Sequence, residues 1–305
     1  MPCDMVVFLV GPTGIGKTEV SVKLAKKIGG EIISCDSMQI YKDMNIITSA
    51  PRRALLKSVK HHLLGVVSPQ KEWNVSAYRR LALKSVKEIF SRGRTPLFTG
   101  GTGLYLSSLV DGIFEERETL PGLRASLEAL DGGILARRLA KVDPEASKKI
   151  HLHDKKRIVR ALEVYESTGH PISALQKRRN GLADTHTVRI FCLSMDRNDL
   201  YARIDARVEK MFSLGLLKEA KSLLGRRLSR TARYAIGLRE LKSYFKGEIS
   251  LDSAKELIKR NSRRYAKRQL TWFRKDKRII WVEAGRRDAP ERIAGRIYSL
   301  LKDGD

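Results

Sequence analysis

The sequence predicts an α/β protein with a parallel sheet core, an inserted all-helical domain and a helical C-terminal region. The apolar, β-branched run at residues 5–10 leads through a glycine-rich turn into helical periodicity, which is the order strand, loop, helix. No strand-like run occurs in the sequence at residues 112–187, where glycine and proline break short charged helical pieces. The apolar run at residues 188–193 then resumes the sheet. We therefore predict a core of residues 1–111 and 188–305 around a helical insertion at 112–187.

The charge balance indicates the class of partner. The 305 residues include 60 Lys and Arg against 34 Asp and Glu, a net charge of +26. With 42% hydrophobic and 31% charged residues, the composition is typical of a folded protein and excludes a disordered chain. So large a cationic excess favours a polyanionic partner, and no stretch approaches the roughly 18 apolar residues of a membrane span. We therefore expect a nucleic-acid partner and no membrane partner.

The cysteines indicate a reducing compartment. Cys3, Cys35 and Cys192 are too few and too scattered for a disulfide framework, and no pair has the spacing of a zinc site. The apolar run at residues 5–10 is too short for a secretory signal, and Asp4 precedes it where a basic region would be needed. We expect a cytoplasmic protein.

A phosphate-binding loop follows the first predicted strand. Its eight residues match the pattern G-x-x-x-x-G-K-T and are Gly11, Pro12, Thr13, Gly14, Ile15, Gly16, Lys17 and Thr18. The glycines let successive backbone N–H groups converge on phosphate oxygens, and the dipole of the following helix adds to the attraction. Lys17 then neutralises charge and the Thr18 hydroxyl can hold Mg²⁺. The sequence therefore predicts a core like that of P-loop NTPases.

The next strands carry one carboxylate. Asp36 follows the strand pattern at residues 31–34, and side chains at the carboxyl ends of parallel strands lie at the ligand crevice. An Asx turn or a helix N-cap is an equally good interpretation of Asp36. The strand at residues 95–99 runs into a second glycine-rich turn at 100–103 without the acid that ATP-cleaving enzymes usually have there. ATP hydrolysis is therefore disfavoured.

Basic helices dominate the rest of the chain. The helix that opens at residues 151–160 has several cations opposite an apolar side, although a solvated basic face explains it as well. Residues 251–280 contain eleven Lys or Arg against three acids. Arg203 and Arg207 are four residues apart, on one predicted helix face, where they could clamp an anion together. The pair His61–His62 lacks a third metal ligand at ordinary spacing, which favours a structural role.

Five segments together resemble the tRNA dimethylallyltransferase family, also called tRNA isopentenyltransferases. The segments are residues 11–18, Asp36-Ser37-Met38-Gln39-Ile40-Tyr41, Gly100-Gly101-Thr102-Gly103-Leu104-Tyr105, residues 151–164 and Tyr265-Ala266-Lys267-Arg268-Gln269-Leu270-Thr271-Trp272-Phe273-Arg274. The match extends over nearly the whole chain. Asn45-Ile46-Ile47-Thr48, Leu238 and Ser262 depart from the family pattern, but none of them removes a phosphate-binding or carboxylate group.

The resemblance implies the reaction and its residues. The family transfers a dimethylallyl group from dimethylallyl diphosphate to the N6 amine of the adenosine 3′ of the anticodon in tRNA. It implies catalytic roles for Asp36, Thr102 and Arg203, with Mg²⁺ held near Thr18, in an enzyme that we expect to be a monomer. The residues that it assigns to the tRNA anticodon stem-loop are Asp36, Ser37, Met38, Gln39, Thr102, Arg124, Lys156, Arg157, Ile158, Val159, Arg160, Lys267, Arg268, Gln269 and Arg274.

The chemistry of such a transfer explains a phosphate loop without ATP cleavage. An aromatic amine is a poor nucleophile, so a carboxylate must accept its proton as the new bond forms, and Asp36 is the candidate. Charge on the departing diphosphate is met by loop N–H groups, Lys17 and an arginine such as Arg203, with Arg207 left open. Two alternatives are a small-molecule P-loop kinase, in which Asp36 orients a hydroxyl, and an RNA-binding protein that uses nucleotide as a switch.

Overall fold

The computed structural model describes residues 4–114, 122–177 and 179–303, which form two compact units. One unit joins Met1–Val110 with Thr185–Asp305, and the other spans Asp111–Asp184. Cys3 lies outside the described residues, whereas Cys35 and Cys192 are buried free thiols.

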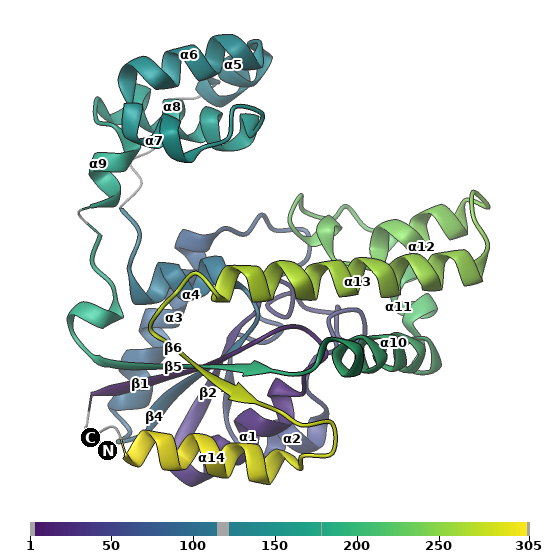
Figure 1. Ribbon diagram of the computed structural model, residues 1–305. Coiled ribbons are helices and arrows are strands. Elements are labelled where there is room, and N and C mark those ends of the chain that lie inside the picture. Colours follow the sequence, from purple (N-terminus) through teal and green to yellow (C-terminus); the bar gives the residue numbers. More distant parts are fainter. Residues whose placement is uncertain (1–3, 115–121, 178, 304–305) are drawn as a thin grey trace. The chain divides into compact units, whose positions relative to one another are not determined.

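The larger unit is built on a sheet that, within the described residues, has six parallel strands in the order β3-β2-β4-β1-β5-β6 (Figure 1). The strands are β1 (Met5–Val10), β2 (Gly30–Cys35), β3 (His61–His62), β4 (Thr95–Gly100), β5 (Thr187–Ser194) and β6 (Ile279–Glu283). The helices of this unit are α1 (Lys17–Ile28), α2 (Arg53–Ser58), α3 (Val75–Phe90), α4 (Gly103–Val110), α10 (Arg197–Ser213), α11 (Leu216–Leu224), α12 (Leu238–Phe245), α13 (Leu251–Phe273) and α14 (Pro290–Lys302). The predicted parallel α/β core is confirmed.

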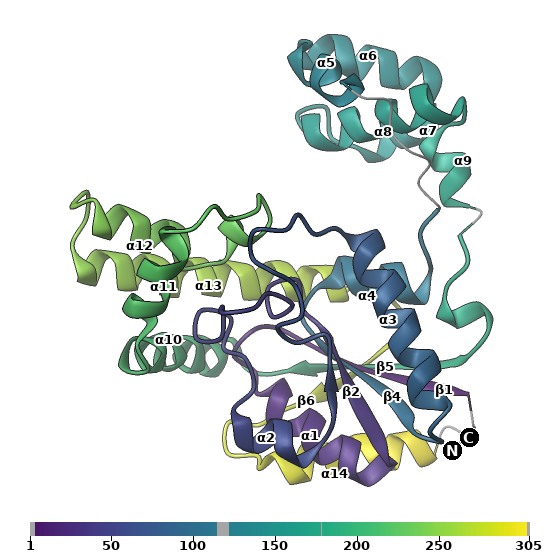
Figure 2. The ribbon, with the colours of Figure 1, turned by 180° about the vertical axis from the view of Figure 1, so that it is seen from behind.

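Helices cover both faces of the sheet, which explains the continuous apolar runs of the central strands. Helices α1 and α14 pack together on one face, and α3 and α4 lie on the other (Figure 1, Figure 2). All six residues of β1 are buried. Val7 and Leu9 belong to the same apolar cluster as Leu24 of α1, while Phe8 stacks on Phe98 with ring centroids 4.6 Å apart.

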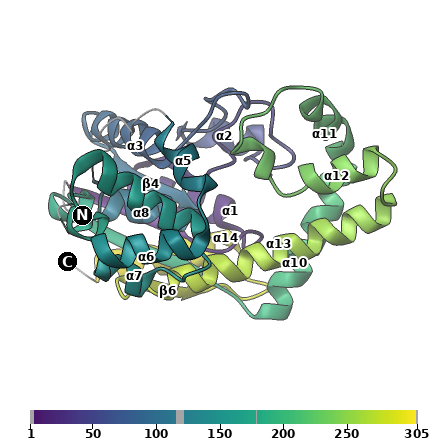
Figure 3. The same ribbon diagram turned by 90° about the horizontal axis from the view of Figure 1, so that it is seen from above.

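The C-terminal third is less uniformly helical than its sequence predicts. After α13 the chain adds β6 beside β5 and then returns as α14 along the sheet. Helices α10, α11, α12 and α13 gather at the side toward which β5 runs (Figure 3). Ile258, Tyr265 and Trp272 recur every seven residues, which predicts that they share one buried face of α13. Of the three, only Ile258 is fully buried, and Trp272 is 39% exposed. This prediction is therefore correct only in part.

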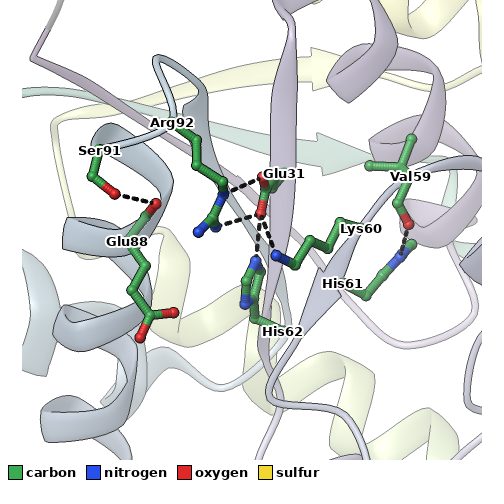
Figure 4. A network of polar contacts seen from close by, with 8 residues as sticks. All are labelled: Glu31, Val59, Lys60, His61, His62, Glu88, Ser91 and Arg92. Carbon is green, nitrogen blue, oxygen red and sulfur yellow. Dashed lines mark hydrogen bonds and ion pairs between the residues drawn. The ribbon is translucent and has the colours of Figure 1, made fainter.

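The edge strand β3 is held by a polar network (Figure 4). Glu31 of β2 accepts hydrogen bonds from Arg92 (Nε to Oε1, 2.9 Å; Nη2 to Oε2, 2.8 Å), and its Oε2 lies 2.7 Å from His62 Nε2. The histidine pair thus has a structural position in the sheet. Within the described residues, no group of three or more His, Cys, Asp or Glu side chains could hold a metal ion.

The smaller unit is helical throughout its described residues. It contains α5 (Leu123–Ala129), α6 (Gly132–Val142), α7 (Pro144–Lys149), α8 (Lys155–Thr168), α9 (Ile172–Gln176) and a 3₁₀ turn at Leu182–Asp184. Leu135 and Leu139 of α6 pack with Ile158 and Leu162 of α8 in a core of its own. Across both units, none of the described helices combines the length and the apolar character needed to cross a membrane.

Candidate active site at the carboxyl ends of the strands

The phosphate loop has the backbone that its glycines predict. Gly14 and Gly16 have φ values of 85° and 97°, in the left-handed region that L side chains rarely adopt. A Cβ atom on Gly14 would lie 2.7 Å from Ile204 Cγ1, and one on Gly16 would lie 3.1 Å from Arg203 Nη2. Helix α10 therefore packs directly on the loop, and only glycine fits at these two positions.

Lys17 reaches back across the loop. Its ammonium group donates hydrogen bonds to the carbonyl oxygens of Gly11 (2.9 Å) and Pro12 (2.8 Å). Withdrawal from water lowers the pKa of Lys17 to about 8, the charge of Asp36 opposes this shift and the charge of Arg207 adds to it. A nearby anion favours the charged form, so binding of an anion in the loop would raise this pKa again.

Two arginines of α10 reach the loop from the same side. Arg207 donates to Thr13 Oγ1, to Ser49 Oγ at 2.8 Å and to the Thr48 carbonyl at 3.3 Å, and burial lowers its pKa. Arg203 is exposed beside Gly16, and no hydrogen bond or ion pair joins it to any described residue. The two arginines thus differ, because Arg207 braces the loop, whereas Arg203 keeps its guanidinium without a partner among the described residues.

Asp36 forms an Asx turn through one carboxylate oxygen and leaves the other without a hydrogen bond in the part of the chain that the structure describes. Its Oδ1 accepts hydrogen bonds from the backbone N–H of Met38 (2.8 Å) and Gln39 (3.3 Å), which is an Asx turn. Its Oδ2 takes no hydrogen bond from the described residues, and the side chain is only half-buried. The carboxylate is thus anchored by one oxygen only.

Neighbouring strands bring these groups together. Asp36 follows β2, Thr102 follows β4 and the phosphate loop follows β1, and these strands are adjacent in the sheet. Thr102 Oγ1 accepts a hydrogen bond from Ser37 N (3.1 Å), which links two of the three turns. Burial lowers the pKa of Lys17 and Arg207, and the charge of Asp36 opposes this shift in both, so the carboxylate and the cations share one electrostatic environment.

Helix α13 closes this site. Gln269 Oε1 accepts from Thr13 N (2.9 Å), and its Nε2 donates to the Gly101 carbonyl (2.9 Å). Trp272 covers Gly103, where any side chain would overlap with the indole ring. Burial and then the charge of Asp36 raise the pKa of Tyr265, which hydrogen-bonds with Thr102. Parts of the chain more than 160 residues apart thus meet around the carboxylate and the phosphate loop.

Comparison with known proteins shows the family of this chain. The family model described as "IPP transferase" matches residues 39–276. A tRNA dimethylallyltransferase of Acetivibrio thermocellus is 42% identical over 98% of this chain and 97% of its own length. The chain belongs to the IPP transferase family. A relative from Carboxydothermus hydrogenoformans, also named tRNA dimethylallyltransferase, is 43% identical over 97% of each chain.

Solved structures agree with this membership. The tRNA isopentenylpyrophosphate transferase of Bacillus halodurans superposes with a TM-score of 0.73 at 36% identity, over 98% of this chain and 97% of that one. A eukaryotic dimethylallyltransferase described as acting on tRNA gives a TM-score of 0.85 at 27% identity, over 98% of this chain and 80% of that one. The family recognised from five sequence motifs is confirmed.

The segment that departs from the family pattern is firmly held. The Glu219 carboxylate accepts hydrogen bonds from the N–H groups of Ile46 (2.9 Å) and Ile47 (2.8 Å). The side-chain amide of Gln39 donates to the carbonyls of Thr48 (3.3 Å) and Ser49 (3.5 Å). Gln39, predicted to contact tRNA, therefore already has a structural role beside the phosphate loop.

The predicted tRNA contacts in the helical unit divide by burial. Lys156 and Arg157 are exposed on α8, whereas Ile158 and Val159 are 1% and 0% exposed in the core. The last two are corrections, because side chains in the core cannot reach a ligand and apolar residues at this helical spacing form the inward face.

Two arginines of the same unit share a buried acid. The carboxylate of Glu163, which is 3% exposed, lies 2.8 Å from Arg160 Nη1 and 3.7 Å from Arg124 Nη1. This buried acid therefore holds the guanidinium groups of two helices, α5 and α8, close together.

A cationic cavity is the feature that sequence reasoning missed. It has a volume of about 1020 Å³, lies among α11, α12 and α13, and is lined by cations at Lys221, Arg226, Arg227, Arg233, Arg239, Lys242, Lys246 and Arg268. Glu240, the acidic residue in its lining, is buried and accepts hydrogen bonds from Gly237 N (3.0 Å) and Asn261 Nδ2 (2.6 Å). The density of Lys and Arg at residues 226–246 is the signal that could have revealed it.

Proposed function

We propose that this chain transfers a dimethylallyl group from dimethylallyl diphosphate to the N6 amine of the adenosine 3′ of the anticodon in tRNA. The observation that carries the proposal is the meeting of a half-free carboxylate, Asp36, with a phosphate loop at adjacent strand ends. A small-molecule kinase could also use Asp36, to orient a hydroxyl, but the strand β4 runs into Gly100 and Gly101 without the carboxylate that ATP-cleaving enzymes usually have there.

The transfer balances with the groups present. The N6 nitrogen attacks C1 of the dimethylallyl group, the C1–O bond breaks and diphosphate leaves with the bonding electrons. The proton on N6 passes to Asp36 Oδ2, the oxygen that the Asx turn leaves free. Because an allylic carbon spreads positive charge, alignment and charge stabilisation supply most of the acceleration, and no covalent enzyme intermediate is needed.

The diphosphate is held by fixed positive groups. We assign this role to the backbone N–H groups of residues 14–18, to Lys17 at the N-terminus of α1 and to the guanidinium of Arg203 beside Gly16. Thr102 completes the site by fixing Ser37 and contacting Tyr265.

Mg²⁺ fits this site. The Thr18 hydroxyl makes no hydrogen bond with the described residues, although it stands in the first turn of α1. A Mg²⁺ ion normally keeps several waters and takes few protein ligands beside substrate phosphates, so an isolated hydroxyl suffices. When bound, the ion would neutralise charge on the departing diphosphate.

Cations outside the site supply the attraction for tRNA. The cavity among α11, α12 and α13, the exposed Lys267, Arg268 and Arg274, and the face of α8 with Lys156, Arg157 and Arg160 are all rich in positive charge. Phosphate contacts of this kind offset the cost of a few kcal/mol for taking the target base out of its stack. A cytoplasmic location and a monomeric state stay predictions.

One assay tests the function against its alternatives. Unmodified tRNA is incubated with Mg²⁺ and either labelled dimethylallyl diphosphate or γ-labelled ATP. We expect only the dimethylallyl label to enter RNA, on the N6 of the adenosine beside the anticodon. Label from ATP on a small molecule would favour the kinase, and binding without any transfer would favour an RNA-binding protein.

A further inference from the structure

We propose that Gln269 is a positioning residue that locks the two glycine-rich turns of the active site to each other and to α13. Its Oε1 accepts a hydrogen bond from Thr13 N in the phosphate loop, and its Nε2 donates to the Gly101 carbonyl in the turn after β4. The inference rests on the proposed function, because one of the turns that it connects is the loop assigned to diphosphate and the other carries Thr102.

The chemistry of the two partners requires glutamine. A backbone N–H can only donate and a carbonyl can only accept, so the residue between them needs one acceptor and one donor on the same planar group. Ionised glutamate lacks the donor, and methionine lacks the donor and offers only a weak sulfur acceptor. The amide orientation is therefore determined by its partners.

The packing leaves the amide no second position. Gln269 is 5% exposed, and a Cβ atom on Gly101 would overlap with its Nε2. The same Cβ would lie 3.3 Å from the Gly11 carbonyl, so the phosphate loop and the Gly101 turn are already in close approach. Glycine at position 101 thus makes room for the amide.

Thr13 is held from two helices at once. Gln269 of α13 binds its backbone N–H, and Arg207 of α10 donates to its side-chain Oγ1. With both contacts the peptide of Thr13 cannot rotate, and the N–H groups that follow it in the loop keep their direction toward phosphate. A loop that is already ordered binds an anion without the cost of ordering it.

The position of Gln269 separates this role from an RNA contact. Lys267 and Arg268 are exposed, whereas Gln269, the next residue, points inward with both amide atoms in use. One helix therefore carries RNA-facing cations on its outside and a connection to the diphosphate cradle on its inside. A substitution of Gln269 should therefore weaken diphosphate binding, and a substitution of Lys267 should weaken tRNA binding.

The experiment compares Gln269→Met with Lys267→Ala. We expect Gln269→Met to lower kcat/KM for dimethylallyl diphosphate and the affinity for inorganic diphosphate with Mg²⁺ by about 10-fold or more, the equivalent of two lost hydrogen bonds. Its Kd for an anticodon stem-loop should stay within about twofold. Lys267→Ala should show the reverse, and a Gln269→Met variant that loses stem-loop affinity but binds diphosphate normally would overturn the inference.

A double-mutant cycle with Gly101→Ala and Gln269→Ala gives a second, independent measurement. It can be carried out even if Gln269→Met does not fold. Gly101→Ala displaces the amide by overlap, and Gln269→Ala removes it, so the two should not add. We expect the double variant to have kcat/KM within about threefold of the worse single variant, and full additivity would contradict the inference. Failure of the proposed function looks different, because the unaltered protein would then transfer no label to tRNA.

Discussion

At the scale of single residues, the active site depends on how one oxygen or one ammonium group is partnered. Asp36 uses Oδ1 for a turn and keeps Oδ2 free, so the two interpretations of its sequence position are both compatible with the fold. The ammonium group of Lys17 donates hydrogen bonds to carbonyl oxygens of its own loop, and burial lowers its pKa. Substitutions of Asp36 test the proposed general base, and substitutions of Lys17 separately test diphosphate binding by the loop.

Asp36→Asn should abolish the base without removing the turn. The asparagine carbonyl can still accept from Met38 N, but the amide cannot take a proton from N6. We expect turnover to fall by about 10²-fold or more, with tRNA affinity nearly unchanged. Single-turnover kinetics and stem-loop titrations measure the two effects, and Asp36→Ala, which also loses the turn, serves as the comparison. Equal losses in rate and in tRNA binding would exclude the catalytic role.

The pKa of Lys17 predicts an alkaline limb in the pH profile. With the pKa lowered to about 8, the free enzyme loses this positive charge as the pH rises through 8, and diphosphate binding weakens. We expect kcat/KM for dimethylallyl diphosphate to decrease above pH 8. In Lys17→Arg the charge persists, so the limb should move to higher pH even if the overall rate is lower. A wild-type profile that stays flat to about pH 9.5 would rule out this assignment.

At the scale of secondary-structure elements, the candidate active site and a stabilising polar network lie toward opposite ends of the strands. The active site lies at the carboxyl ends of β1, β2 and β4, whereas Glu31 stands near the beginning of β2, with Arg92 and His62 around it (Figure 4). Burial by itself would raise the pKa of Glu31, but hydrogen bonds from Arg92 and His62 outweigh it and lower the pKa to about 2. The network therefore stabilises β3, the shortest strand and an edge of the sheet.

Glu31→Gln should destabilise the fold in a pH-dependent way. Because the folded pKa lies below the unfolded value, the stabilisation is complete above about pH 4.5 and disappears as the pH falls toward 2. We expect a loss of ~2–3 kcal/mol in unfolding free energy at pH 7 and a smaller loss at pH 3. Urea unfolding measures it, and Glu88→Gln, an exposed acid near Lys84, is the control with an effect below ~0.5 kcal/mol. An effect of Glu31→Gln that does not change with pH would contradict the explanation.

At the scale of the whole molecule, a charge of +26 makes RNA binding sensitive to salt. Each phosphate that a cation neutralises contributes roughly 0.7–0.9 to the slope of log K against log salt. We expect the affinity for tRNA to fall steeply between low and moderate salt. Arg239→Ala, in the cationic cavity, should reduce the slope by about 1, whereas Lys84→Ala, an exposed cation on α3, should leave it unchanged. Affinity that is independent of salt would refute tRNA binding through these cations.

Local patterns determined much of this protein in advance. The phosphate loop, the carboxylate after β2, the parallel sheet and the helical insertion depend on residues close in sequence, since glycine φ angles and strand or helix periodicity are local properties. The edge strand β6 was missed because its five residues follow a long basic helix and are only partly buried. Trp272 was expected inside because periodicity shows which residues share a face but not whether another element covers it.

Only the tertiary structure decided how distant segments share the site. Arg203 and Arg207 are equivalent in sequence, yet packing of α10 leaves one guanidinium exposed at Gly16 and ties the other to Thr13. Gln269 looks like part of an RNA-binding motif until the fold brings it to Gly101, 168 residues away. The sequence by itself determined which chemistry is present, because motifs are read from neighbouring residues. Which side chain faces the ligand and which braces the loop follows from contacts between helices and strand ends, and no local pattern encodes those.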